Sequence, residues 1–158
     1  MLATTMKFAG KGCAASLLFA TALLSAAQPT FDGTWQMDTA KSHVSDGRVI
    51  TLTFATVNDG IKMTMKIRKS DGQEITSEFT SKLDGKASEF AEGTHKSQLT
   101  VWYNGPTLNA CKEKGPVGDV TSVWKFELGP DKKSMTMKIS HYEPVADDET
   151  LVFAKKES

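Results

Sequence analysis

The sequence is poor in cysteine, and this scarcity limits how the chain is held together. Only Cys13 and Cys111 occur in 158 residues. Cys13 lies in an N-terminal leader described below, so Cys111 has no internal partner and a disulfide framework is excluded. The one residue of basic charge beside Cys111 is Lys112, which is weak support for an activated thiol. We therefore expect Cys111 to be buried and inert, with intermolecular pairing as the alternative.

Catalytic motifs are also missing. The three histidines, His43, His95 and His141, form no pair at metal-ligand spacing. No serine lies in a nucleophile motif, and no glycine-rich loop joins a strand to a helix, which disfavours nucleotide binding. We therefore predict that the protein is not an enzyme and that it uses no cofactor.

Long apolar runs and an excess of positive charge are absent as well. The one apolar run, residues 13–24, is about 12 residues long and falls short of the roughly 20 that span a bilayer. Lys7 and Lys11 precede this run and small residues, 25–27, follow it, which is the pattern of a secretory signal peptide. We expect residues 1–27 to be that signal and residues 28–158 to be a single domain, located in the periplasm or secreted.

The charge of the mature chain gives no sign of a polyanionic partner. Of the 19 basic residues, Lys7 and Lys11 lie in the leader, which leaves 17 against 19 acidic residues and a net charge of −2. Nucleic-acid binding is therefore not expected. No stable membrane insertion is expected after signal cleavage, and the oligomeric state is left open.

What the chain does contain is an alternation of apolar and polar residues with a period of two, which is typical of half-buried strands. The clearest case is residues 61–69, where Ile61, Met63, Met65 and Ile67 share one face and lysines, threonine and arginine share the other. The same pattern predicts about ten strands in all, at residues 34–40, 49–57, 61–69, 73–83, 86–91, 98–103, 107–113, 120–128, 134–141 and 150–155. Residues 92–95 and 142–148 are expected to be loops.

Short turns rich in Asn-Gly and Asp-Gly separate these strands, for example Asn58-Asp59-Gly60 and Asp84-Gly85. Short connections favour a meander, and an open sheet of this size would expose two long edges. Closure removes the edges. We therefore predict an all-β fold, a single antiparallel up-and-down β-barrel of about 8–10 strands.

The apolar faces of these strands carry the functional hypothesis. In a closed barrel they point inward, and a barrel of this size either is filled by its own side chains or holds one small ligand. Methionine suits a surface that must adapt to a ligand. Ser77 and Ser81 also fall on the apolar side, which hints at a hollow interior. The predicted ligand-binding residues are Met63, Met65, Phe79, Val101, Trp124, Phe126, Met135 and Met137.

Four segments carry a resemblance to a known group. Gly33-Thr34-Trp35 resembles the Gly-x-Trp signature of the lipocalins and the wider calycin group. Residues 31–42 resemble the opening of small secreted bacterial lipocalin-like proteins of unassigned function. The pair Trp124-Lys125, the segment 133–136 and the terminal Lys155-Lys156 are similar to later motifs of those proteins.

The resemblance implies a β-barrel with an internal cavity for small hydrophobic molecules. Lipocalins place a late arginine against the signature tryptophan, whereas the arginines here are Arg48 and Arg68. Lys155 or Lys156 would take that place through a cation–π contact, and a ten-stranded, fatty-acid-binding shape fits the sequence equally well. We expect Trp35 to be buried and to contact the last strand near Phe153 or Lys155.

Three functions remain open on the sequence alone. The first is an exported lipocalin-like protein that binds a small apolar ligand in its barrel. The second is a filled barrel that acts as a protein-interaction or inhibitor module. A remote third is Cu(I) binding by Met63, Met65, Met135 and Met137, with His141 on the same face as Met137. No metal ligand is assigned.

Overall fold

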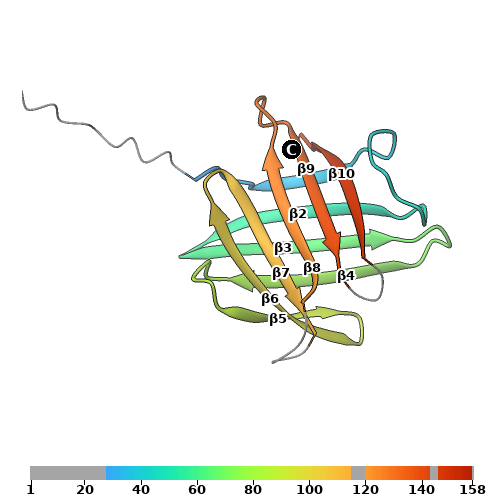
Figure 1. Ribbon diagram of the computed structural model, residues 1–158. Coiled ribbons are helices and arrows are strands. Elements are labelled where there is room, and N and C mark those ends of the chain that lie inside the picture. Colours follow the sequence, from blue (N-terminus) through green and yellow to red (C-terminus); the bar gives the residue numbers. More distant parts are fainter. Residues whose placement is uncertain (1–27, 115–119, 143–145, 158) are drawn as a thin grey trace, which may run out of the picture.

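The computed structural model describes residues 28–114, 120–142 and 146–157. Ten strands make up this part of the chain (Figure 1): β1 (Gly33–Met37), β2 (Val49–Val57), β3 (Gly60–Arg68), β4 (Glu74–Ser81), β5 (Ala87–Glu92), β6 (His95–Asn104), β7 (Thr107–Glu113), β8 (Val120–Leu128), β9 (Ser134–His141) and β10 (Asp147–Lys155). The predicted signal peptide lies outside the described residues. None of the described residues belongs to a helix long and apolar enough to cross a membrane.

All strand pairs are antiparallel, and the sheet order is β4-β3-β2-β1-β10-β9-β8-β7-β6-β5. The first strand therefore bonds to both β2 and the last strand, and in Figure 1 the group β2–β4 crosses the group β8–β10 at a steep angle. This confirms the predicted all-β, up-and-down architecture as a nearly closed barrel of ten strands.

The barrel has one seam, between β4 and β5. These strands stand at the two ends of the sheet order and share no hydrogen-bonded ladder. Side chains bridge the seam, because Phe79 of β4 meets Phe90 of β5 edge to face with ring centroids 6.4 Å apart. The two rings keep water out where backbone bonds are missing.

Two segments predicted as loops are partly strand. The ladder between β5 and β6 runs on to Glu92 opposite His95, so that only Gly93 and Thr94 form the turn. In the same way β10 begins at Asp147, opposite His141 of β9. Polar composition suggested loops in both places, but pairing with a neighbouring strand decides where a ladder ends.

The first strand, by contrast, ends at Met37 and not at Ala40. The Asp38 carboxylate accepts a hydrogen bond from the Ala40 N–H (3.1 Å), so the side chain turns its own backbone out of the strand. Residues 38–48 then cross one end of the barrel. This is the end at which β3, β7 and β9 finish, and it is called the open end below.

The opposite, closed end is filled by aromatic side chains. Phe31 packs on Phe54 and Phe126 with centroids 5.8 and 6.5 Å apart, and on Tyr103 at 6.4 Å. Trp35 lies fully buried beside them, and its indole N–H donates to the Phe31 carbonyl (2.7 Å). The chain segment before β1 therefore plugs this end.

The contact predicted between Trp35 and the last strand is confirmed. Trp35 pairs with Lys155 across the β1–β10 ladder, and the Lys155 ammonium lies 5.3 Å from the centre of the indole. Gly33 permits this approach. It has φ +120°, and a Cβ at that position would lie 2.8 Å from Lys155 Cε. Lys155 therefore takes the position against the signature tryptophan that a late arginine takes in the lipocalins.

Candidate functional site

The open end of the barrel contains a cavity of about 460 Å³. Its wall is mainly aliphatic and sulfur-containing, with one indole, and it comes from strands on both sides of the barrel. The apolar lining consists of Ile50, Met65, Ile67, Ile75, Trp124, Met137 and Ile139. Exposed residues such as Ser70 and Asp71 belong to the rim, so the cavity reaches the solvent at this end.

The structure brings three of the eight predicted ligand-binding residues together at this cavity: Met65, Trp124 and Met137. The other five are buried in the core without lining it: Met63, Phe79, Val101, Phe126 and Met135. Alternation tells which face of a strand a residue occupies, but not how far along the barrel axis it lies. A ligand-binding role for the eight stays a prediction.

Four isoleucines of the wall were missed by the sequence interpretation. Ile50, Ile67, Ile75 and Ile139 occupy the same inward faces as the predicted residues, but nearer the open end. The signal that could have found them is the alternation itself, extended to the strand ends. Lys112, a charged residue of the cavity rim that was also missed, has a similar signal. It follows Leu108 and Ala110 at intervals of two on β7 and therefore shares their inward face.

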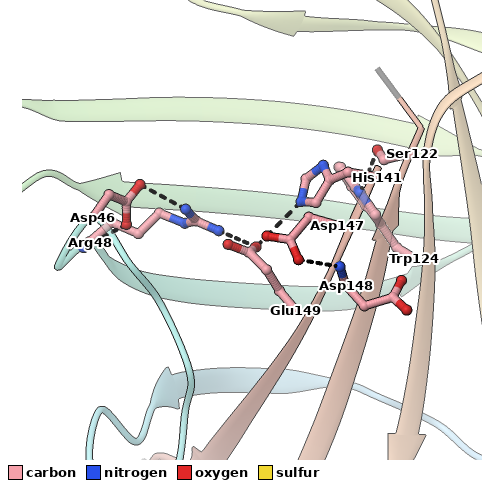
Figure 2. Close-up of polar contacts among 8 residues, drawn as sticks. All are labelled: Asp46, Arg48, Ser122, Trp124, His141, Asp147, Asp148 and Glu149. Atoms are coloured by element: carbon pink, nitrogen blue, oxygen red, sulfur yellow. Dashed lines mark hydrogen bonds and ion pairs between the residues drawn. The ribbon is translucent and has the colours of Figure 1, made fainter. Parts of the chain in front are cut away.

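A charged network lies at one side of the mouth (Figure 2). The Arg48 guanidinium donates to Asp46 (Nη1 to Oδ2, 2.7 Å) and, through Nη2, to the Glu149 carboxylate. His141 Nε2 lies 3.4 Å from the same Glu149 oxygen. The side chains of Arg48 and Glu149 are only 19% and 12% exposed, so this pair is well shielded from water.

The pairing of Arg48 with Asp46 shifts the pKa of both groups. Burial alone would raise the pKa of Asp46, but the hydrogen bonds and charge of Arg48 outweigh it and hold that pKa below its usual value. Burial likewise would lower the pKa of Arg48, whereas Asp46 and Glu149 together raise it. Both shifts favour the charged forms of Asp46 and Arg48, so these two side chains are an ion pair at neutral pH.

A second ion pair faces the mouth from β5 and β7. Lys112 donates to the Glu92 carboxylate, with the two side chains 21% and 26% exposed. The Lys112 ammonium also lies 5.5 Å from the centre of the Phe90 ring. The cavity therefore has an apolar wall, and two cations of its rim, Arg48 and Lys112, already have carboxylate partners.

Two serine hydroxyls point into the barrel interior. The Trp124 indole N–H donates to Ser122 Oγ (2.9 Å), and both residues line the cavity. Ser77 Oγ is buried without a hydrogen-bond partner among the described residues. Ser81, the other serine predicted on the apolar side, accepts a hydrogen bond from the Leu83 N–H (3.3 Å).

The described residues include no group of three or more His, Cys, Asp or Glu side chains that could hold a metal ion. The four methionines of the copper hypothesis lie on β3 and β9, where Met65 and Met137 line the cavity and Met63 and Met135 belong to the core. These positions do not test Cu(I) binding, which stays a prediction.

Cys111 is half-buried, not fully buried as predicted, because it points outward between the inward-facing Ala110 and Lys112. Burial raises the pKa of the Cys111 thiol, and the charge of Glu113 adds to the shift. The thiolate is the reactive form, so a raised pKa favours low reactivity, and the inertness of Cys111 stays a prediction.

We expect Cys111 to react several-fold more slowly with Ellman's reagent at pH 7 in the native protein than after unfolding in urea. The measurement uses the chain that starts at Gln28, in which Cys111 is the sole cysteine. The native rate should still rise above pH 8.5, the ordinary thiol pKa. Equal rates in the native and unfolded protein would show that the thiol is unperturbed.

Comparisons with known proteins identify the fold. No protein-family model matches the sequence, and no curated protein matches it either. Among solved structures, a protein described as "REP1-NXSQ fatty acid transporter" superimposes with a TM-score of 0.59 at 12% identity, covering 81% of this chain and 97% of the other. Apo lipid binding protein 8 of Caenorhabditis elegans gives 0.58 at 11% identity, covering 83% and 100%.

Fatty-acid-binding protein 1 of Echinococcus granulosus is similar in the same degree, with a TM-score of 0.58 at 14% identity over 80% of this chain and 98% of the other. By their descriptions these three are binding or transport proteins and not enzymes. At such identities the likeness shows the fold alone, a barrel of the fatty-acid-binding and calycin type.

Proposed function

We propose that this protein binds a small hydrophobic molecule in the cavity at the open end of its barrel. The observation that carries the proposal is the apolar-walled cavity of about 460 Å³. Ligand sites generally measure roughly 300–1,000 Å³ and have mostly apolar walls with a few polar groups. The descriptions of the structural neighbours as fatty-acid or lipid-binding proteins add support.

The physical basis is the transfer of apolar surface out of water. Each Å² of apolar surface that a ligand buries contributes roughly 25 cal/mol. Met65 and Met137 offer flexible, polarisable contacts, while the Trp124 ring, held by its bond to Ser122, offers a fixed one. Such a wall accommodates ligands that differ in shape more readily than ligands that differ in charge.

The alternative of a filled barrel requires a packed interior along the whole axis. The closed half is packed in this way, but the open half holds the cavity, which favours ligand binding. A surface-acting interaction or inhibitor role remains a prediction without a specific observation behind it.

We also propose that the chain is exported to the periplasm or secreted. The support is the sequence pattern of residues 1–27, with two lysines before a short apolar run and small residues after it. N-terminal sequencing of protein recovered from its host should then begin at Gln28. A first residue at Met1 or Leu2 would contradict export by a cleaved signal.

Binding is tested with Nile red, a neutral apolar dye whose fluorescence rises in apolar surroundings. The wild-type protein should bind it at a single site. Ile67→Trp should weaken that binding at least tenfold, a loss of about 1.4 kcal/mol, because the half-buried Ile67 lines the cavity and the larger ring would fill it.

The matched control is Lys66→Trp, which adds the same ring to the neighbouring, exposed position of β3 outside the cavity. It should leave Nile red binding unchanged. The proposal fails if the wild type does not bind the dye, or if Ile67→Trp binds it as tightly as Lys66→Trp.

A further inference from the structure

The charges at the mouth of the cavity do not favour a negative ligand. The cations on the rim are Arg48, Lys69 and Lys112, and the carboxylates on the rim are Asp46, Asp71 and Glu92. Glu149 joins this set through its contacts with Arg48 and His141. Among the described residues, four carboxylates thus face three fixed cations, and His141 is one further basic group in contact with Glu149.

The two most shielded cations are already occupied. Arg48 divides its donors between Asp46 and Glu149, and Lys112 donates to Glu92. Lys69 is exposed and donates to Gln73 Oε1 (2.8 Å).

The wall does offer a neutral hydrogen-bond donor. Ser122 Oγ accepts from the Trp124 indole, and no acceptor for its own hydroxyl proton is found among the described residues. Ser122 is 4% exposed and lines the cavity. A buried hydroxyl gains free energy when it finds an acceptor, and a ligand oxygen can supply one.

We propose that the cavity selects a neutral apolar molecule bearing one oxygen acceptor, of the class of long-chain alcohols, ketones and esters, over the anion of a fatty acid. This inference rests on the proposed function and narrows its ligand class. An anionic head group entering the mouth must lose its hydration. To reach Arg48 or Lys112, the two shielded cations, it must also break an existing ion pair. A neutral oxygen needs only the Ser122 hydroxyl, and its chain extends along the apolar wall.

The test compares two ligands of equal length, 1-decanol and decanoate, as competitors of Nile red at pH 8, where decanoate is ionised. Decanol should bind at least tenfold more tightly than decanoate. Ser122→Ala also frees the Trp124 ring, which contacts either ligand, so decanol binding should weaken several-fold more than decanoate binding does. Circular dichroism and Nile red binding show whether each variant is folded and still has its cavity.

Glu149→Gln provides an independent test, because it removes one of the two carboxylates that occupy Arg48. Decanoate should then bind about tenfold more tightly than to the wild type, while decanol stays unchanged. The control Asp148→Asn makes the same charge change at an exposed position of β10 that does not line the cavity, and should affect neither ligand.

The outcomes separate the two proposals. If the wild-type protein does not bind Nile red, the proposed function itself is wrong. If Nile red binds and decanoate equals or exceeds decanol in affinity, the function stands and the selectivity for neutral ligands is overturned. If Asp148→Asn changes decanoate binding as much as Glu149→Gln does, the effect is long-range electrostatics and the assigned role of Arg48 is wrong.

Discussion

Replacing Trp35 by alanine is expected to lower the free energy of unfolding by about 3–5 kcal/mol, the usual cost of removing a large buried aromatic ring. The ring is fully buried, its N–H is bonded to the Phe31 carbonyl, and its face receives the Lys155 ammonium. Through these two contacts, Trp35 of β1 holds both the segment before β1 and the last strand. Urea unfolding followed by circular dichroism measures the change.

Two further tryptophan variants make this test interpretable if Trp35→Ala does not fold. Trp35→Phe retains a ring but leaves the buried Phe31 carbonyl without its donor, which should cost about 1–3 kcal/mol. Trp102→Ala removes a half-buried indole on the outer face of β6 and should cost about 1–2 kcal/mol, since less surface returns to water. If Trp35→Ala lowers the free energy of unfolding no more than Trp102→Ala does, Trp35 does not help to close the barrel.

Replacing Gly60 by alanine is the second change with a large expected effect. Gly60 begins β3, and a Cβ there would lie 2.0 Å from the Ser81 carbonyl oxygen and 2.9 Å from Lys82 Cα. Both atoms are backbone, so no side-chain rotation relieves the clash. Overpacking in a rigid site typically costs about 1–3 kcal/mol, and we expect at least the upper value, because the end of β4 must move.

Gly72→Ala is the matched control for Gly60→Ala. Gly72 has φ +86° and open space around its missing Cβ, so alanine there meets backbone strain of about 1–2 kcal/mol but no clash. Differential scanning calorimetry of both variants should show the larger drop in melting temperature for Gly60→Ala. Equal drops would mean that β3 and β4 separate at little cost.

Much of the fold could be predicted because strand periodicity is a local property. Residues 49–57, 107–113, 120–128 and 134–141 were predicted with the bounds that the structure has. Errors arose at Glu92, at His95 and at residues 147–148, where pairing with a neighbouring strand extends the ladder through polar residues. Pairing between strands is a property of the assembled sheet, and one segment alone does not encode it.

The cavity was harder to predict than the barrel. Phe126 and Trp124 lie two residues apart on the same inward face, yet the first belongs to the packed closed end and only the second lines the cavity. Depth along the axis depends on the stagger between strands, which alternation does not reveal. Arg48 was missed for a related reason, since its partner Glu149 is distant in sequence and meets it only after β1 joins β10.

The ladder between β1 and β10 also constrains when this protein can acquire its structure. Residue 35 pairs with residue 155, so the barrel cannot close during translation until residues 147–155 have left the ribosome. Non-local strand pairing of this kind is slow, because the chain loses the entropy of the long intervening loop before any stabilising contact between the two strands forms. Until then β1 and β2 expose an edge that other chains can join. We therefore expect the unfinished chain to be most prone to aggregation before β10 is available to pair with β1.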